Sequence, residues 1–450
     1  MRPLGALTYA EALGLLERAL TFGINPSLDG IRALTVALGM PQDAFCSMQV
    51  TGTNGKTSVA RIASALLSAH GQRTGTYTSP HLVSYTERMS VNGAPVAEED
   101  LAAALSAVAA VVGDAIACNA ETLGVTPASL GLANTEFELL TAAALWFFRE
   151  RECDWACLEV GMGGRWDATS VVSPKVAVVT GVGLDHTDRL GVTREEIATD
   201  KAHIIKSGSV AVLGPGCEGV ESVFSARVAE TGARVVRVGL ADEDVAWRVT
   251  AVPDRPGGQA RMDVYGVYAT YDTLLVVAPS YQAPNVATAI AAVEAALGRA
   301  LEPDTVRAVL EGLTFPGRFE LLSAEPPLVV DGAHNPQAAG VLASAISEAF
   351  GERKPVAVLG ILRDKDAEGI VRALAPVVSA FVCTRNDSPR SLSPEELAEI
   401  VRRTTNRRLF TEERIEGALR VAEALAREAE TGVVVTGSLY TVGEVRASSS

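Results

Sequence analysis

The sequence contains few aromatic residues, few cysteines, fewer basic than acidic residues and no long apolar run. Aromatic residues make up only 5% of its 450 residues, although the hydrophobic fraction is 48% and the charged fraction 21%, as in typical globular domains. This composition excludes a disordered chain and a collagen-like repeat. The six cysteines form no C-x-x-C pair. Their irregular spacing excludes a disulfide-dominated scaffold and favours free thiols in a reducing compartment.

The deficit of basic residues excludes one class of partner. Lys and Arg number 39 against 54 Asp and Glu, which gives a net charge of −15. Because nonspecific binding to phosphate backbones needs a basic surface, we expect no nucleic-acid partner. The longest weakly polar stretch, residues 102–113, is too short to span a bilayer, so we expect no membrane partner. We expect no signal peptide either, and a cytoplasmic monomer that acts on small molecules.

Apolar runs alternate with amphipathic segments along most of the chain. Strands are predicted at residues 44–50, 155–160, 176–180 and 210–213, and helices at about 57–70 and 136–149. Strands that alternate with helices predict an α/β fold with a parallel, doubly wound sheet. Residues 245–278 alternate at short period around Pro-Gly turns, which predicts a small antiparallel patch attached to this first domain.

The length predicts two domains. Residues 314–319, Thr-Phe-Pro-Gly-Arg-Phe, indicate the linker between them, because Pro and Gly interrupt regular structure. After the linker the alternation of strands and helices restarts, with Ser393 as a predicted N-cap and Pro394 at the first helical position. We therefore expect an N-terminal domain at residues 1–313 and a smaller α/β domain at residues 320–450.

Residues 51–58, Thr-Gly-Thr-Asn-Gly-Lys-Thr-Ser, lie between a predicted strand and a predicted helix. Glycines let successive N–H groups converge on a phosphate, and the helix N-terminus adds partial positive charge. Lys56 is expected to neutralise nucleotide phosphates and the Thr57 hydroxyl to ligate Mg²⁺. Val50 stands where the strict motif has its first glycine, and a Gly-rich turn with a solvated lysine is the alternative. The residues expected at the phosphates are Gly52, Thr53, Asn54, Gly55, Lys56, Thr57 and Ser58.

Polar residues follow several predicted strands, where open α/β sheets bind their ligands. Glu159 ends one strand and His186 follows another, and both side chains are competent ligands of a divalent ion. Ser79, in the segment Thr-Ser-Pro-His-Leu, could add a hydroxyl oxygen. Taken singly, each of these is better interpreted as a surface or turn residue. Asp331 ends the first strand of the second domain, and we expect it to face the cleft between the domains.

Ordered segments over nearly the whole chain resemble the folylpolyglutamate synthase/dihydrofolate synthase family, a branch of the Mur ligase superfamily. They include GTNGKTS, TSPHLVSYTERMSVNG, LEVGMGGRWDAT, LDHTDRLG, DKAHIIKSG, PGRFE and DGAHNP. The resemblance implies an ATPase domain with a phosphate loop, like the central Mur ligase domain, and a Rossmann-like glutamate ligase domain. It implies an ATP-dependent ligase of folate biosynthesis that adds L-glutamate to dihydropteroate, to tetrahydrofolate or to both, through an acyl phosphate.

The resemblance also implies roles for single residues. The implied ligands of one or two Mg²⁺ ions are Thr57, Ser79, Glu159, His186 and a carbamylated Lys201. The implied nucleotide contacts beyond the phosphate loop are Asn285, Arg318, Asp331 and His334. The implied substrate contacts are His81, Phe137 and Asp167, and the implied catalytic residues are Lys56, His186, Lys201 and Arg318. The residues alone favour a different interpretation of Lys201, a solvated lysine on a helix.

Two other functions stay open at this point. A peptidoglycan-precursor ligase would use the same chemistry, but we would expect an additional N-terminal nucleotide-sugar domain, for which fifty residues before the phosphate loop leave no room. A nucleotide-dependent switch or binding module would hydrolyse ATP or GTP without joining two molecules. Its second domain would need no polar residues at strand ends, and its ADP release would not respond to glutamate.

Overall fold

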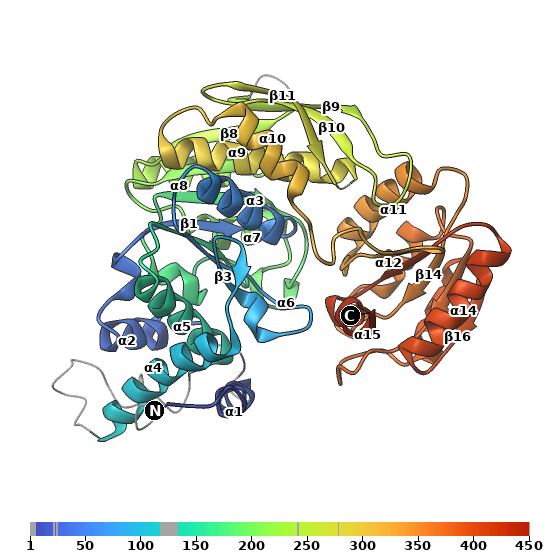
Figure 1. Cartoon of the computed structure of the whole chain (residues 1–450), viewed down its shortest axis with the longest axis horizontal. Coiled ribbons are helices and arrows are strands. Elements are labelled where there is room, and N and C mark those ends of the chain that lie inside the picture. Colours follow the sequence, from blue (N-terminus) through green and yellow to red (C-terminus); the bar gives the residue numbers. More distant parts are fainter. Residues whose placement is uncertain are drawn as a thin grey trace. The chain divides into compact units, whose positions relative to one another are not determined.

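The computed structural model describes residues 6–20, 23, 26–117, 134–240, 243–277 and 279–449. The chain packs as two compact units (Figure 1). The first unit comprises residues 1–246, 265–269 and 284–305, and the second comprises residues 247–264, 270–283 and 306–450. Among the residues described, none of the helices has both the length and the apolar composition that crossing a membrane requires.

The first unit is built on a mostly parallel sheet. Its strands are β1 (Cys46–Thr51), β2 (Thr74–Tyr77), β3 (Met89–Val91), β4 (Ala94–Pro95), β5 (Trp155–Glu159), β6 (Val176–Gly181), β7 (Val210–Gly216) and β8 (Arg234–Gly239). They lie in the order β8-β7-β6-β1-β5-β2-β3-β4. All neighbouring pairs from β8 to β2 are parallel, and β3 and β4 add antiparallel pairs at one edge. This arrangement confirms the predicted α/β fold.

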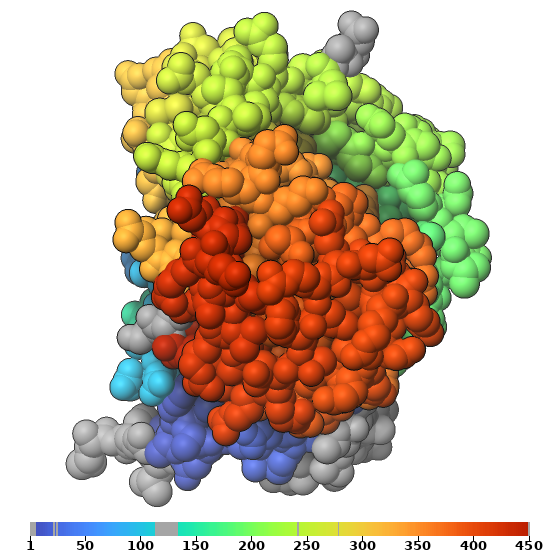
Figure 2. All heavy atoms as spheres, turned by 90° about the vertical axis from the view of Figure 1, so that its right-hand side faces the viewer, coloured from blue at the N-terminus to red at the C-terminus, as the bar shows by residue number. Residues whose placement is uncertain are grey.

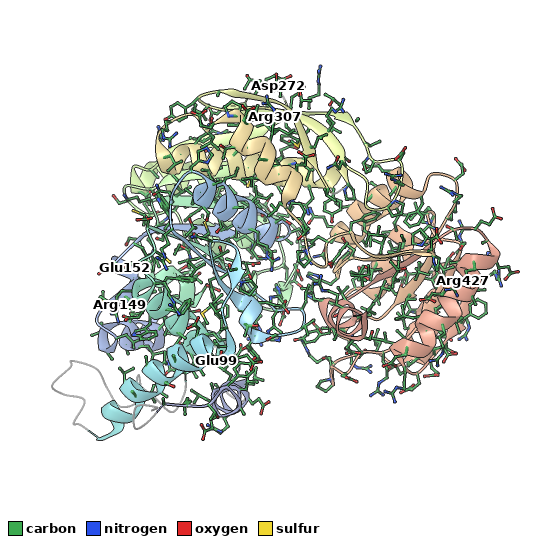
Figure 3. The ribbon with its side chains drawn as sticks, viewed as in Figure 1. Glu99, Arg149, Glu152, Asp272, Arg307 and Arg427 are labelled. Carbon is green, nitrogen blue, oxygen red and sulfur yellow. The ribbon has the colours of Figure 1, made fainter. Side chains whose placement is uncertain are left out.

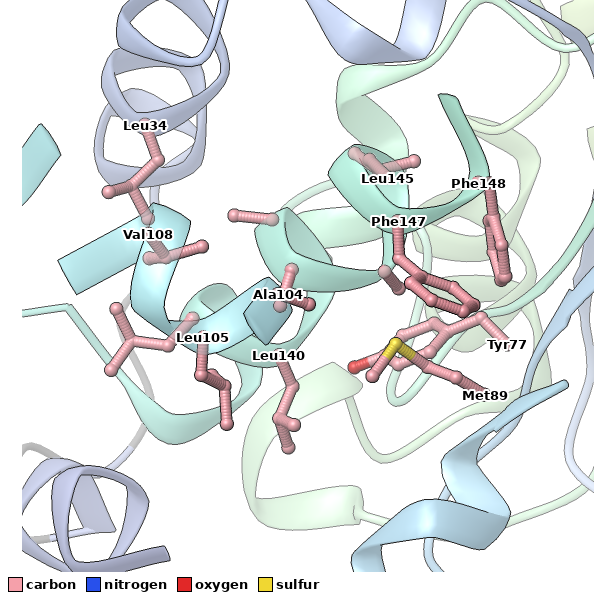
Figure 4. Close-up of a cluster of buried hydrophobic side chains, with 14 of the residues drawn as sticks. Leu34, Tyr77, Met89, Ala104, Leu105, Val108, Leu140, Leu145, Phe147 and Phe148 are labelled. Carbon is pink, nitrogen blue, oxygen red and sulfur yellow. The ribbon is translucent and has the colours of Figure 1, made fainter. Parts of the chain in front are cut away.

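Helices cover this sheet. They are α1 (Tyr9–Ala19), α2 (Asp29–Ala37), α3 (Lys56–Ala69), α4 (Glu98–Ala117), α5 (Glu136–Glu150), α6 (Thr187–Leu190), α7 (Arg194–Ala202), α8 (Glu221–Thr231) and α9 (Ala283–Leu297). A capping box of Thr135 and Glu138 begins α5. The core under α5 gathers Leu34 of α2, Val108 of α4 and Tyr77 of β2, all fully buried (Figure 4). Each such side chain contributes roughly 1.5–3 kcal/mol by burial, which fixes α5 and β2 against each other.

The predicted short-period strands form β9 (Val245–Ala251), β10 (Ala260–Tyr265) and β11 (Thr270–Val276), in the order β11-β10-β9. Most of their residues, 247–264 and 270–276, belong to the second unit, whereas the sequence predicted that they attach to the first domain. Arg307 on α10 (Pro303–Gly312) and Asp272 on β11 point toward each other and form an ion pair of 2.6 Å (Figure 3). Both side chains are partly exposed, so the pair adds little stability but marks how α10 meets β11.

A second, smaller sheet follows in this unit. Its strands are β12 (Glu320–Ala324), β13 (Pro327–Val330), β14 (Val356–Leu359), β15 (Ala380–Cys383), β16 (Arg408–Thr411) and β17 (Val433–Thr436), in the order β12-β13-β17-β14-β15-β16. Only the β12–β13 pair is antiparallel. The helices are α11 (Pro336–Phe350), α12 (Ala367–Leu374), α13 (Pro394–Thr404), α14 (Ile415–Glu428) and α15 (Leu439–Ser449). Figure 2 shows one face of this part in orange and red. Ser393 caps α13 and Pro394 begins it, as predicted.

Candidate active site

The carboxyl ends of three adjacent parallel strands, β5, β1 and β6, meet at one edge of the first sheet. Val50 pairs with Glu159, and Thr51 pairs with Val179, so residues 51–58, Glu159 and Gly181 lie at the same edge. After β1 the chain continues to β2, on one side of β1 in the sheet. After β5 it continues to β6, on the opposite side of β1. Such a switch point is where open α/β sheets bind ligands.

Residues 51–58 turn from β1 into α3 in a conformation that only glycine permits at two positions. Gly55 is the N-cap of α3 with φ of 84°, and a Cβ there would lie 2.5 Å from Oδ1 of Asn285. A Cβ on Gly52 would lie 1.9 Å from Oγ1 of Thr180. No side chain caps the N-terminus of α3. Its N–H groups and the helix dipole therefore suit an anion, as the sequence predicted for a phosphate.

Hydrogen bonds to the end of β6 hold this loop in place. The N–H of Thr53 donates to the carbonyl of Gly181 at 2.9 Å, and its hydroxyl oxygen accepts from the N–H of Gly183 at 2.8 Å. The hydroxyl of Thr180 donates to the carbonyl of Asn54 at 2.6 Å. Thr180 is a residue that the sequence did not single out, because a threonine in a strand carries no local signal of a loop contact.

Two lysines converge on one carbonyl oxygen of the loop. Nζ of Lys56 and Nζ of Lys201 each lie 3.1 Å from the carbonyl oxygen of Gly52. Lys201 is on α7 and is only 4% exposed, so the interpretation of a solvated lysine is wrong. Burial, and then repulsion by Lys56, lower the pKa of Lys201 to about 7. The preceding Asp200 accepts the N–H of Gly164 at 2.8 Å, which ties α7 to the glycine-rich segment after β5.

Glu159 contacts two other predicted metal ligands, Thr57 through its hydroxyl and Ser79 through its backbone N–H. It is 1% exposed at the end of β5. Its Oε1 accepts the hydroxyl hydrogen of Thr57 at 2.8 Å, and its Oε2 accepts the N–H of Ser79 at 3.1 Å. Hydroxyl and carboxylate oxygens are the donors that Mg²⁺ prefers. Within the described part of the chain, no three His, Cys, Asp or Glu side chains gather as a metal site. This small donor set fits Mg²⁺, which takes few protein ligands and completes its coordination with water and phosphate oxygens.

His186 lies in the turn after β6. It is the N-cap of α6 in a left-handed conformation with φ of 51°, and its side chain is exposed. Its Nε2 lies 4.0 Å from Oδ2 of the neighbouring Asp185. An exposed imidazole is open to a ligand from solution, but the role of His186 as a metal ligand stays a prediction.

Two predicted substrate residues lie side by side beyond Glu159. A Cβ on Gly161 would lie 2.8 Å from the ring of Phe137 and 3.2 Å from Oδ2 of Asp167, so both flank this glycine. Asp167 is 8% exposed, and burial raises its pKa. Oδ1 of Asp167 accepts the N–H of Thr169 at 3.0 Å. An aromatic ring beside a buried carboxyl suits a flat heterocycle that offers N–H donors.

The third predicted substrate residue, His81, is half-buried in the segment after β2. Its Nδ1 accepts a hydrogen bond from Nε of Arg88 at 2.9 Å. Burial, and then the charge of Arg88, lower the pKa of His81 to about 4. Arg88 is a site residue that sequence reasoning missed, although it stands in the same motif.

The second unit holds the other predicted nucleotide residues around Asp331. Asp331 is 5% exposed, and burial raises its pKa against the lowering effect of Arg318. Its Oδ2 accepts from the N–H of Phe319 at 2.8 Å and from the hydroxyl of Tyr281 at 3.1 Å. Nδ1 of His334 lies 2.8 Å from the carbonyl oxygen of Gly332.

Arg318 lies close to the same turn. A Cβ on Gly332 would lie 2.7 Å from Nη1 of Arg318, so this glycine leaves room for the guanidinium. Arg318 also lines a pocket of about 370 Å³ within the second unit. Sequence analysis did not predict a role for Tyr281, because it lies fifty residues before Asp331, whose carboxylate accepts its hydroxyl hydrogen.

The chain matches two family models. Residues 50–293 match the Mur ligase middle domain, and residues 317–439 match the Mur ligase glutamate ligase domain. The predicted boundary at residues 314–319 stays a prediction, and these matches leave residues 294–316 between them.

Solved and curated relatives extend the likeness to the whole chain. Dihydrofolate synthase/folylpolyglutamate synthase of Mycobacterium tuberculosis is 38% identical in an alignment of 447 residues that covers 94% of this chain and 90% of that protein. A structure of folylpolyglutamate synthase of that organism complexed with ADP has a TM-score of 0.89 at 37% identity and covers 98% of each chain. A bifunctional folylpolyglutamate synthase/dihydrofolate synthase of Yersinia pestis complexed with AMPPNP and Mn ion has a TM-score of 0.81 at 29% identity, covering 100% of this chain and 99% of that one. The chain therefore belongs to the folylpolyglutamate synthase/dihydrofolate synthase family of Mur ligases.

Proposed function

We propose that this protein is an ATP-dependent ligase that joins L-glutamate to a folate-type carboxylate. The single observation that supports this most is the buried Glu159, which links the hydroxyl of Thr57 in the phosphate loop to the N–H of Ser79 in the segment after β2. One carboxylate thus joins a phosphate site to the segment that carries a predicted substrate residue. The names of the relatives, and the ADP and AMPPNP of their structures, support ATP as the second substrate.

In the proposed reaction the acceptor carboxylate attacks the γ-phosphorus of ATP, and ADP leaves. The amine of glutamate then attacks the acyl carbon, and phosphate leaves from the tetrahedral intermediate. The chain needs no nucleophile of its own for these steps. Lys56 and the N–H groups at the start of α3 neutralise and align the phosphates, which is the main contribution that a protein makes to phosphoryl transfer.

Thr57, Ser79 and Glu159 would hold Mg²⁺, with His186 as a further proposed ligand. The ion would supply charge neutralisation at the β- and γ-phosphate oxygens. Glu159 positions the hydroxyl of Thr57, so the carboxylate orders the site before the nucleotide arrives.

We also propose that Lys201 is carbamylated in the active protein. Its amine is buried beside the ammonium of Lys56, and a second positive charge there is costly. The neutral amine adds CO₂ and loses a proton, which forms a C–N bond and leaves an anionic carbamate. That carbamate would pair with Lys56 and offer oxygen atoms to a second ion.

The acceptor is proposed to bind beside Phe137 and Asp167, where an aromatic ring and a buried carboxyl flank Gly161. From the second unit, Arg318, Asp331 and His334 are proposed to contact the nucleotide, as is Asn285 beside the phosphate loop. We further propose that the protein acts as a cytoplasmic monomer on small molecules and binds no nucleic acid.

The test is a ligation assay with purified protein, ATP, Mg²⁺ and labelled glutamate, with dihydropteroate and tetrahydrofolate offered separately. We expect labelled product with at least one acceptor and none without ATP. ADP release that requires neither glutamate nor an acceptor would instead support a nucleotide-dependent switch. The acceptor that yields labelled product identifies which of the two the protein uses.

A further inference from the structure

A buried arginine lies against the predicted substrate residue His81. Arg88 is 8% exposed at the end of a short 3₁₀ helix, Tyr85–Arg88. Its Nε donates to Nδ1 of His81 at 2.9 Å, and its Nη2 lies 3.2 Å from Oε1 of Glu136. Its guanidinium carbon lies 5.0 Å from the ring centroid of Tyr85, and that ring lies 4.3 Å from the imidazole of His81. An ion pair, a hydrogen bond and a ring contact thus fix Arg88.

The hydrogen bond determines where the imidazole carries its proton. A guanidinium has donors and no acceptor, so the ring nitrogen that it contacts must accept. A nitrogen that accepts carries no proton, and in a neutral imidazole the proton then resides on the other nitrogen. Arg88 therefore leaves His81 with a donor at Nε2. It also restrains the ring orientation, because Nδ1 is held at 2.9 Å and the ring packs against that of Tyr85, with the centroids 4.3 Å apart and the planes tilted by 47°.

The same arginine links two elements of the proposed substrate site. His81 is two residues after Ser79, whose N–H contacts Glu159. Glu136, which pairs with Arg88, is directly before Phe137 on α5. One buried guanidinium thus joins the segment after β2 to the helix that carries the aromatic substrate residue.

We propose that Arg88 is a positioning residue for the acceptor: it fixes the tautomer and orientation of His81, so that Nε2–H of His81 donates to an oxygen or ring nitrogen of the folate-type substrate. The proposal rests on the proposed function, and it assigns to Arg88 no contact with the substrate itself. Glu136 supplies the opposite charge beside Arg88, with Nη2 of Arg88 at 3.2 Å from Oε1 of Glu136.

The first test is kinetic. Arg88→Met keeps the length of the side chain and removes its charge. Glu136→Gln is combined with it, because the carboxylate of Glu136 would otherwise stay buried without its charged partner. We expect this double variant to raise the KM for the acceptor about tenfold, as the loss of one oriented hydrogen bond does, while the KM for ATP stays unchanged. Arg151→Met is a control at a more exposed arginine away from His81: Arg151 lies 5.0 Å from the ring of Phe147 and pairs with Asp100.

Non-additivity tests whether Arg88 acts through His81. In a His81→Ala background, adding Arg88→Met and Glu136→Gln should change the acceptor KM no further, because the residue that Arg88 positions is gone. A further rise of several-fold, or an equal rise in the KM for ATP, would overturn the proposal. The thermal unfolding midpoint of each variant is measured as well, because a general loss of structure would lower it.

The second test reads the tautomer directly and needs no activity. The chain has only five histidines, so ¹⁵N NMR of labelled imidazoles is tractable, and His81→Gln assigns the signals of His81. We expect a single Nε2–H tautomer in the native protein and a mixture of tautomers in the Arg88→Met/Glu136→Gln protein. An Nδ1–H tautomer in the native protein, or no change in the variant, would overturn the role of Arg88. A native protein that ligates glutamate to no acceptor would instead overturn the proposed function.

Discussion

Lys56 and Lys201 both donate to the carbonyl oxygen of Gly52, each at an Nζ–O distance of 3.1 Å. Two ammonium groups that share one oxygen repel each other, and this repulsion is the second cause, after burial, of the lowered pKa of Lys201. An anion beside them relieves the repulsion. The two candidates are a phosphate of ATP and a carbamate on Lys201, and they differ in what they predict for variants of Lys201.

Replacing Lys201 by Ala should reduce ligation by about 10²-fold if the lysine supplies a carbamate that neutralises Lys56 and holds an ion. Lys201→Arg should not restore activity, because it keeps the positive charge and cannot add CO₂. A short carboxylic acid added to the Ala variant should restore part of the rate by occupying the vacated space. The measurement is the initial rate of product formation with and without the acid.

Native protein in CO₂-depleted buffer is the companion measurement. Its rate should fall and recover when bicarbonate is added. Full activity in CO₂-depleted buffer, together with high activity of Lys201→Arg, would show that the buried lysine works as a simple cation.

Glu159→Gln should lower the rate by about 10²-fold and raise the Mg²⁺ concentration needed for half-maximal rate by about 10- to 100-fold. The amide is isosteric, so the hydroxyl of Thr57 keeps a partner while the negative charge is lost. Glu138→Gln is a control, since Glu138 is also a buried glutamate but caps α5. Near-normal activity of Glu159→Gln at limiting Mg²⁺ would remove this residue from the metal site.

Arg318→Ala should slow catalysis and raise the KM for ATP about tenfold or more, without changing the affinity for the acceptor. The reason is that Arg318 is proposed to contact the nucleotide, whereas the proposed acceptor residues belong to the first unit. Arg363→Ala is the control in the same unit, because Arg363 forms an exposed ion pair with Glu396. An unchanged rate at saturating and subsaturating ATP would leave Arg318 as a structural residue only.

Gly55→Ala should abolish ATP binding, whereas Gly71→Ala should leave it intact. The two glycines flank α3 with nearly equal φ angles of 84° and 82°, so an added Cβ strains the backbone about equally at each. Only at Gly55 would the Cβ also meet a side chain, Oδ1 of Asn285, at 2.5 Å, whereas nothing lies within 4 Å at Gly71. Titration of both variants with ATP measures their affinities for the nucleotide. A loss at Gly55→Ala alone shows the effect of the clash with Asn285, whereas equal affinities of the two variants would contradict the assigned geometry.

The sequence was informative wherever the signal was local. The strand, loop and helix around Gly55 follow from an apolar run, glycines and helical spacing, and the position of Glu159 follows because parallel strands end at one edge of a sheet. The strands at residues 245–276 and the cap at Ser393 have equally local causes.

The residues that were missed or misjudged are those whose environment comes from distant parts of the chain. Lys201 looked solvated because its helix is polar, and its burial depends on the packing of α7 against a loop 149 residues earlier. Thr180 and Tyr281 are ordinary residues of a strand and a turn until the fold brings Asn54 and Asp331 to them. No pattern within a single segment encodes such contacts.

The measurement that most directly tests ligation through an acyl phosphate is the fate of the acceptor oxygen. The acceptor is labelled with ¹⁸O in its reacting carboxylate and incubated with ATP, Mg²⁺ and glutamate, and the released phosphate is analysed by mass spectrometry. Ligation through an acyl phosphate predicts one ¹⁸O atom in each phosphate, formed only when glutamate is present, because the carboxylate oxygen that attacks phosphorus leaves with it. Phosphate that carries an oxygen from solvent water, released at the same rate without glutamate, would contradict it.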